Sequence, residues 1–148
     1  MKLGFIGCGN MASAIIGGIL NKGLAQPEDI CASVKTQSSA QKIQNTLGIS
    51  CTTDNLEVAK TADYLFLAVK PQFCTDVALQ IKDVLTDKQV IISVIAGKNL
   101  EWLKEHLGND KKIIRTMPNT PALVGEGVTG VCPDNLTSDE DLQNVLTL

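Results

Sequence analysis

A glycine-rich turn near the N-terminus constrains the fold of this chain more than any other feature. Residues 2–6 (KLGFI) are a short apolar run, and the next six residues (GCGNMA) match the pattern G-x-G-x-x-A. Residues 11–20 are apolar enough to form a helix that packs on a sheet. The pattern therefore predicts a strand, a tight turn and a helix, which is the usual start of an open α/β sheet.

The small residues of this turn suit the binding of a diphosphate. Gly7 permits the tight turn, Gly9 leaves room for a pyrophosphate to approach the main chain, and Ala12 allows the helix to pack closely on the strand. The free N–H groups and the dipole of the first helical turn favour an anion there. The motif predicts a dinucleotide ligand, although glycine-rich turns also serve as plain connectors.

Strand patterns and helix patterns alternate along the rest of the chain. We expect strands at 30–34, 49–52, 64–69, 90–95, 112–117 and 128–132, and helices at 38–47, 54–62, 75–85 and 99–107. Ser38 or Ser39 is expected to cap the first of these helices, and Ser138 with Asp141 to cap a last one. This order predicts one domain over residues 1–148 with a doubly wound, mostly parallel sheet.

The last helix carries an apolar stripe of Leu142, Val145 and Leu146. No later element is available to pack against this stripe, so we expect the natural protein to be longer.

Composition excludes several classes of function. The net charge of -3 and the lack of a basic stripe with aromatic residues argue against nucleic acid or an anionic membrane as partner. The five cysteines are odd in number and contain no C-x-x-C pair, which argues against a disulfide framework or a metal site. With no targeting segment or membrane span in the sequence, we expect reduced thiols and a cytoplasmic protein.

The end of the second expected strand bears on the choice of cofactor. A site that prefers NAD usually has Asp or Glu there, whereas this chain has Ser33, Val34, Lys35 and Thr36. Hydroxyl groups and a lysine can bond a 2'-phosphate, so NADP(H) is the preferred cofactor and NAD(H) remains possible. A solvated polar turn is the alternative interpretation of Ser33 and Lys35.

Four stretches, taken together, resemble a known enzyme family. They are GFIGCGNMASAI from Gly4, FLAVKP from Phe66, SVIAG from Ser93 and RTMPNTPALVGEG from Arg115. In this order and spacing they resemble the N-terminal, Rossmann-like nucleotide-binding domain of pyrroline-5-carboxylate reductase over almost the whole chain. The resemblance implies an oxidoreductase of proline biosynthesis that transfers hydride from NAD(P)H to the C=N bond of 1-pyrroline-5-carboxylate and gives L-proline.

The resemblance also implies which residues line the cofactor groove, most of them at the ends of expected strands. These are Ile6, Gly7, Cys8, Gly9, Asn10, Met11, Ser33, Asn55, Ala68, Val69, Lys70, Pro71, Ala96 and Gly97, to which the residue-by-residue reasoning adds Ala12 and Lys35. Asn119 and Thr120 are implied to lie near the nicotinamide and the substrate. For Asn55, the pattern alone indicates only a helix cap.

Members of this family continue into a helical domain that dimerises and holds the substrate. The resemblance therefore implies catalytic residues beyond Leu148, a homo-oligomeric parent protein, and no activity for residues 1–148 alone. Two alternatives stay open at this point. One is a related NADP-dependent enzyme such as a 3-hydroxyacid dehydrogenase, and the other is a non-catalytic NADP-binding module.

Overall fold

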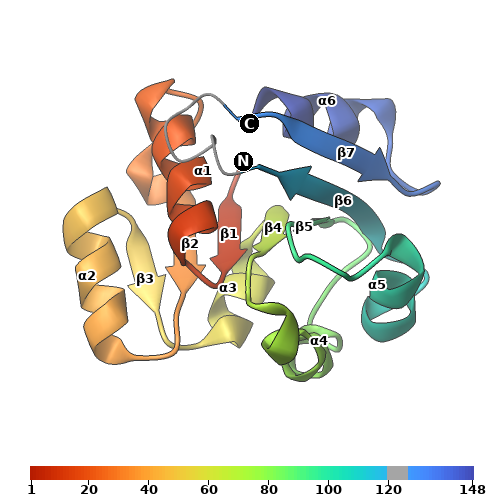
Figure 1. Ribbon diagram of the computed structural model, residues 1–148, viewed down its shortest axis with the longest axis horizontal. Helices are drawn as coiled ribbons and strands as arrows, with labels where there is room; N and C mark the ends of the chain where they lie inside the picture. Colours follow the sequence, from red (N-terminus) through yellow and green to blue (C-terminus); the bar gives the residue numbers. More distant parts are fainter. Residues whose placement is uncertain (120–126) are drawn as a thin grey trace.

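The computed structural model describes residues 1–119 and 127–148, and seven strands of these residues form one sheet (Figure 1). In chain order the strands are β1 (Leu3–Ile6), β2 (Ile30–Ser33), β3 (Ser50–Thr52), β4 (Tyr64–Leu67), β5 (Val90–Ser93), β6 (Lys112–Pro118) and β7 (Thr129–Pro133). Their order across the sheet is β3-β2-β1-β4-β5-β6-β7, in which β1 to β6 are parallel and β7 is antiparallel to β6. The predicted doubly wound, mostly parallel sheet is confirmed.

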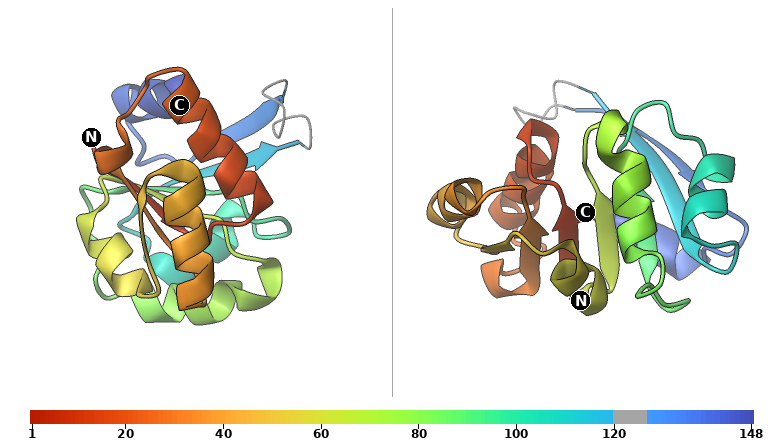
Figure 2. Two further views of the ribbon diagram at one scale, coloured as in Figure 1. Left: turned by 90° about the vertical axis from the view of Figure 1, so that its left-hand side faces the viewer. Right: turned by 90° about the horizontal axis from the view of Figure 1, so that it is seen from below.

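Helices cover both faces of the sheet (Figure 2). One face carries α1 (Asn10–Asn21), α2 (Gln37–Leu47) and α6 (Asp139–Thr147), and the other carries α3 (Asn55–Thr61), α4 (Cys74–Ile81) and α5 (Leu100–Leu107). Two short 3-10 turns, Pro27–Asp29 and Pro71–Phe73, precede β2 and α4. This two-sided cover explains why the central strands are almost entirely apolar.

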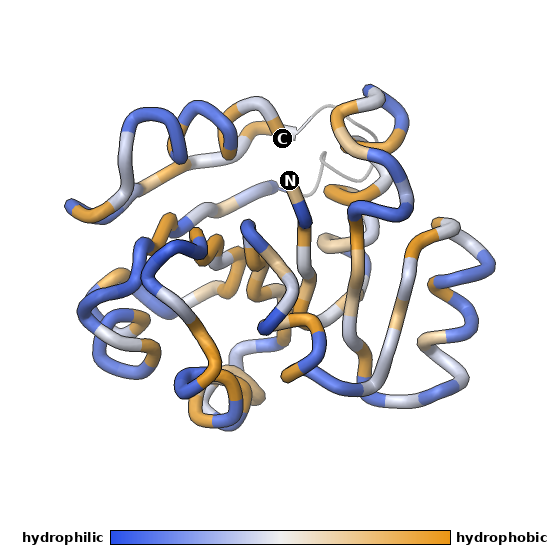
Figure 3. Tube along the Cα trace, turned by 180° about the vertical axis from the view of Figure 1, so that it is seen from behind, coloured by the Kyte–Doolittle hydropathy of each residue, from blue (hydrophilic) through white to orange (hydrophobic). Residues whose placement is uncertain are grey.

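Side chains alternate between two cores, one on each face of the sheet. Leu3 and Phe5 of β1 face α1, whereas Ile6 faces the side covered by α3 and α4. Phe5 pairs with Phe66 of β4, and the two rings stack with centroids 4.4 Å apart. Apolar residues gather along the strands and polar residues along the outer turns of the helices (Figure 3).

Several helix boundaries differ from those expected. The cap of α2 is Thr36, whose hydroxyl accepts the Ser39 N–H, rather than Ser38 or Ser39. Asp54 caps α3 and makes Asn55 the first helical residue instead of the cap. α4 ends at Ile81, although Leu85 beyond it is still buried. A polar side chain one residue away sets the start of α2 and of α3, and a turn ends α4; the apolar pattern reports neither.

The apolar stripe of the last helix packs in part against elements that precede it in the chain. Val145 is buried in the same core as α1, and Leu142 packs at the edge of that core. The Asn144 side chain also donates a hydrogen bond of 2.8 Å to the Tyr64 hydroxyl on β4. β7 runs antiparallel to β6, from Thr129 beside Pro118 to Pro133 beside Ile114, and α6 then covers this part of the sheet, while Leu146 stays 54% exposed.

Candidate functional site

The glycine turn begins with a residue that the fold itself requires to be glycine. Gly7 has a φ of 88°, which L-residues with a side chain rarely adopt. A Cβ at this position would lie 2.7 Å from the carbonyl oxygen of Ala68. The Gly7 N–H also donates to the Ser33 carbonyl at 3.0 Å. Gly7 thus holds the ends of β1, β2 and β4 close together.

Gly9 differs from Gly7 because nothing inside the protein requires it to be glycine. Its φ is -84°, which any residue can adopt, and a Cβ there would meet no atom within 4 Å among the described residues. The residue is exposed and forms the N-cap of α1. The missing side chain therefore leaves open space at the surface and is not needed for packing inside the protein. A site for an external group requires such space.

The start of α1 is also electrostatically suited to an anion. Side chains cap α2, α3, α5 and α6, namely Thr36, Asp54, Asn99 and Ser138, whereas no side chain caps α1 or α4. The first turn of α1 contains no acidic residue. Its N–H groups and the positive end of its dipole are directed at the space beside Gly9.

Cys8 adds no negative charge to this turn. Its sulfur lies 3.7 Å from the Ser13 hydroxyl, and the side chain packs against the core under α1. Burial raises the pKa of the Cys8 thiol, although the Ser13 contact partly offsets the effect. The thiol is therefore protonated at neutral pH, and Asn10, Met11 and buried Ala12 complete a turn without charge.

Ser33 and Asn55, both implied by the resemblance, are brought into direct contact. The Ser33 hydroxyl is fully buried and donates a hydrogen bond of 2.7 Å to Asn55 Oδ1. Asn55 Nδ2 in turn donates to Oε1 of Gln80 on α4 at 2.9 Å. The Ser33 proton is thus directed to Asn55 rather than to the surface. Sequence reasoning missed Gln80, because no local pattern marks it.

Lys35 reaches across the end of β1 toward the loop after β4. Its ammonium lies 3.0 Å from the centroid of the Phe73 ring. Lys35 is exposed, whereas Phe73 is half-buried at the end of the turn Pro71–Phe73. Sequence reasoning singled out Lys35 but missed Phe73, since only the sheet order brings the two segments together.

The remaining predicted groove residues lie at the same edge of the sheet. Because β1, β4 and β5 are parallel, with Ile6 beside Leu67 and Leu67 beside Ser93, the segments that follow these strands emerge together. They are the half-buried Ala68 and Val69, the exposed Lys70 and Pro71, and the exposed Ala96 and Gly97. Carboxyl-end loops of this kind are where open α/β sheets bind ligands.

Asn119 follows β6, and its Oδ1 accepts the Val128 N–H at 2.9 Å. The side chain thus joins the two ends of the connection between β6 and β7. Thr120, the other residue implied to lie near the nicotinamide, is outside the described residues. The roles of both in contacting a nicotinamide or a substrate stay predictions.

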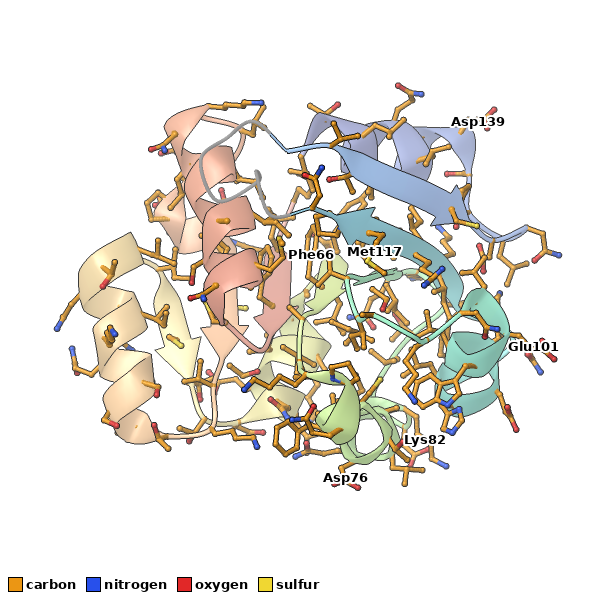
Figure 4. All side chains as sticks on the ribbon, in the orientation of Figure 1. Phe66, Asp76, Lys82, Glu101, Met117 and Asp139 are labelled. Atoms are coloured by element: carbon orange, nitrogen blue, oxygen red, sulfur yellow. The ribbon has the colours of Figure 1, made fainter. Side chains whose placement is uncertain are left out.

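A cavity of about 220 Å³ lies on the α1 side of the sheet, next to α6. Phe66, which lines this cavity, lies near the centre of the sheet in Figure 4. The lining is mostly aliphatic and comprises Ile15, Phe66, Ile92, Val94, Thr116, Pro118, Thr129, Val131, Val145, Leu146 and Leu148. None of these side chains titrates, so the cavity offers no acid or base.

Within residues 1–119 and 127–148, no group of three or more His, Cys, Asp or Glu side chains could hold a metal ion. No helix of this part of the chain is long and apolar enough to cross a membrane.

The fold and the glycine turn define a nucleotide-binding α/β domain of the oxidoreductase type. The chain belongs to the family described as NADP oxidoreductase coenzyme F420-dependent, which matches residues 2–97. Over nearly its full length it also matches the N-terminal half of pyrroline-5-carboxylate reductases, which confirms the resemblance carried by the four motifs.

Curated relatives and solved structures agree on this similarity. The Escherichia coli pyrroline-5-carboxylate reductase is 41% identical over 99% of this chain and 55% of its own length, and the Methanosarcina acetivorans enzyme is 36% identical over 99% and 54%. The Coxiella burnetii enzyme superposes with a TM-score of 0.90 at 33% identity, over 98% of this chain and 53% of that one. The chain therefore spans about half the length of the relatives it matches.

One solved relative contains a cofactor. The Plasmodium falciparum pyrroline carboxylate reductase has NADP bound and matches with a TM-score of 0.87 at 34% identity, over 98% of this chain and 52% of that one. The Mycobacterium tuberculosis 3-hydroxyisobutyrate dehydrogenase matches with a TM-score of 0.75 at 10% identity, which is a likeness of fold alone.

Proposed function

We propose that this chain is the NADP(H)-binding domain of a pyrroline-5-carboxylate reductase. In the complete protein it would hold the reduced cofactor against 1-pyrroline-5-carboxylate, whose C=N bond is reduced to give L-proline. The observation that carries the proposal is Gly9. Neither its backbone conformation nor its surroundings need a glycine, so the open space it leaves beside the uncapped end of α1 is explained by a ligand that approaches the main chain.

The diphosphate would be held by main-chain groups of the glycine turn. N–H groups at residues 10–12 point out of the first turn of α1 and can donate to phosphate oxygens. Gly7 keeps this turn close to the ends of β2 and β4. The neutral Cys8 thiol avoids repulsion of the phosphates, so the site binds through dipoles rather than through a formal positive charge.

The nicotinamide would lie toward the loops after β4 and β5. The bound cofactor supplies a hydride from its C4 position. The chain's own contribution is to orient it, through the backbone of residues 68–71, the small residues Ala96 and Gly97, and the connection that starts at Asn119. We propose that the substrate carboxylate site and the donor of the proton to the ring nitrogen lie in the half of the relatives that this chain does not span.

The choice of NADP over NAD would be made at the end of β2. Ser33 to Thr36 contain no carboxylate that would repel a 2'-phosphate, and Lys35 supplies an ammonium. Glu28 and Asp29 precede β2 and so lie at its opposite end, where Asp29 pairs with Lys2 at 2.7 Å. The Plasmodium relative with bound NADP supports the same preference.

Two alternatives make different predictions. A 3-hydroxyacid dehydrogenase shares only the fold with this chain, and it would be inactive toward pyrroline-5-carboxylate. A non-catalytic NADP-binding module would bind the cofactor without turnover even when the second half of the protein is present. Nothing in the described residues favours either of these over a reductase.

The experiment that tests the proposal has two parts. Calorimetry of residues 1–148 with NADPH should give saturable binding that Gly9→Val abolishes, while circular dichroism shows an unchanged fold. The complete protein should then oxidise NADPH when 1-pyrroline-5-carboxylate is added and produce proline. Absence of binding to the folded chain would refute the nucleotide site, and binding without proline formation by the complete protein would refute the reductase.

A further inference from the structure

We propose that Phe73 is a positioning residue for cofactor selection, because its ring holds the Lys35 ammonium where a 2'-phosphate would arrive. This inference rests on the proposed function and names a determinant of its specificity. The pair joins two segments that lie far apart in the chain. Its members would discriminate NADPH from NADH by different means, Lys35 by charge and Phe73 by holding that charge in place.

The contact spans the groove at the position where the adenosine half of a dinucleotide would lie. Lys35 follows β2, and Phe73 ends the turn that follows β4. β2 and β4 are the two neighbours of β1, whose carboxyl end carries the glycine turn. The ammonium, 3.0 Å from the ring centroid, therefore lies over the end of β1 and bridges the two walls of the groove.

The Phe73 ring is held in place by more of its surroundings than the exposed Lys35 side chain is. Phe73 is half-buried, its N–H donates to the Lys70 carbonyl at 2.9 Å, and the next residue, Cys74, is 2% exposed. α4, which starts there, is tied to α3 by the hydrogen bond between Asn55 and Gln80. Lys35 is exposed and makes no ion pair with any carboxylate of the described residues.

This arrangement leaves the ammonium able to bind a second group. A ring face contacts one side of a cation, whereas an ammonium has three N–H donors that can rotate. Donors on the side away from Phe73 remain free for phosphate oxygens. Because the ring restricts a long and flexible side chain, less order is lost when the phosphate binds. A 2'-hydroxyl, as in NADH, gains little from the same ammonium.

Five variants of residues 1–148 test the inference by calorimetry with NADPH and with NADH. Phe73→Leu removes the ring but keeps apolar bulk, Phe73→Tyr keeps the ring, and Lys35→Met removes the charge. Lys82→Met, at the exposed lysine that follows the last residue of α4 (Figure 4), controls for the loss of one positive charge. The double variant Lys35→Met/Phe73→Leu tests whether the two residues act together.

We expect Lys35→Met to weaken NADPH binding about 10-fold or more, and Phe73→Leu to weaken it about 2- to 5-fold. NADH binding should change less than 2-fold in both. Phe73→Tyr and Lys82→Met should match the original chain. The double variant should bind NADPH like Lys35→Met alone, because the ring acts only through the lysine.

Equal loss of NADPH and NADH binding in Phe73→Leu would overturn the inference, as would an additive loss in the double variant. A Phe73→Leu chain with unchanged NADPH affinity would overturn it too. If Phe73→Leu fails to fold, Phe73→Met, which also removes the ring and keeps apolar bulk, takes its place with the same expected results. Failure of the original chain to bind either nucleotide would instead refute the proposed function.

Discussion

The buried hydroxyl of Ser33 donates its hydrogen bond to Oδ1 of Asn55, 2.7 Å away, and so links the end of β2 to the first residue of α3. Asn55 continues the link to Gln80 of α4. Ser33 and Asn55, which are both among the residues that the family resemblance assigns to the cofactor groove, are therefore also structural partners. A variant at either position affects the scaffold under the groove as well as any contact with a ligand.

Asn55→Ala is expected to destabilise the domain by about 1–3 kcal/mol, because the buried Ser33 hydroxyl loses its acceptor. Ser33→Ala should cost less, since Asn55 is only half-buried and can turn to water. The double variant should be less destabilised than the sum of the two single ones. Urea unfolding of the four proteins measures this coupling, and strict additivity would contradict the link.

Gly7→Ala is expected to reduce stability by at least about 1–3 kcal/mol through backbone strain alone. The φ of 88° is unfavourable for alanine, and the new Cβ would meet the Ala68 carbonyl oxygen at 2.7 Å. Thermal or urea unfolding without ligand is the measurement. A variant as stable as the original chain would show that the turn tolerates a side chain.

Gly9→Ala should behave in the opposite way. Its φ of -84° and the open space around its Cβ predict a change in stability below about 1 kcal/mol. NADPH affinity should nevertheless fall 10-fold or more, because the methyl group occupies the space where the diphosphate meets the main chain. Unfolding and calorimetry on the same sample separate the two effects. An NADPH affinity that is unchanged in Gly9→Ala would argue against a diphosphate site beside Gly9.

Stability should decline at alkaline pH partly through Cys51. Burial raises the pKa of the Cys51 thiol from about 9 to about 11, and the residue is 6% exposed. Above pH 9 the unfolded chain loses this proton while the folded chain keeps it, so unfolding becomes more favourable as pH rises. The contribution amounts to about 1 kcal/mol at pH 10.

Cys51→Ala should therefore lose less stability than the original chain between pH 8 and pH 10, with the difference measured by urea unfolding in the presence of a reductant. The two proteins are otherwise identical in sequence, so the effects of all other groups cancel in the comparison. Identical pH dependence would mean that Cys51 ionises in the folded state as it does in the unfolded chain.

Local patterns were sufficient for much of the fold. The strand, glycine turn and helix at the N-terminus are consecutive in the chain, and the capping box joins Ser138 to Asp141 only three residues on. Such features depend on backbone conformation and nearby side chains, which neighbouring residues determine. The alternation of strands and helices likewise predicted the parallel sheet.

Features that join distant segments were not predictable in the same way. The contact between Lys35 and Phe73, the link from Asn55 to Gln80 and the packing of Val145 beside α1 all depend on the order of strands in the sheet. No single segment carries a signal for them. They arise only when β2 and β4 lie on either side of β1 and β7 runs back along β6.

The amino-acid sequence by itself determined that the chain forms an alternating α/β domain with a glycine turn after its first strand, because periodicity and glycine placement act over short distances. Only the tertiary structure separated Gly7, which the backbone requires, from Gly9, which neither the backbone conformation nor the described surroundings require to be glycine. The distinction depends on which atoms surround each Cβ, and those atoms come from strands far apart in the chain.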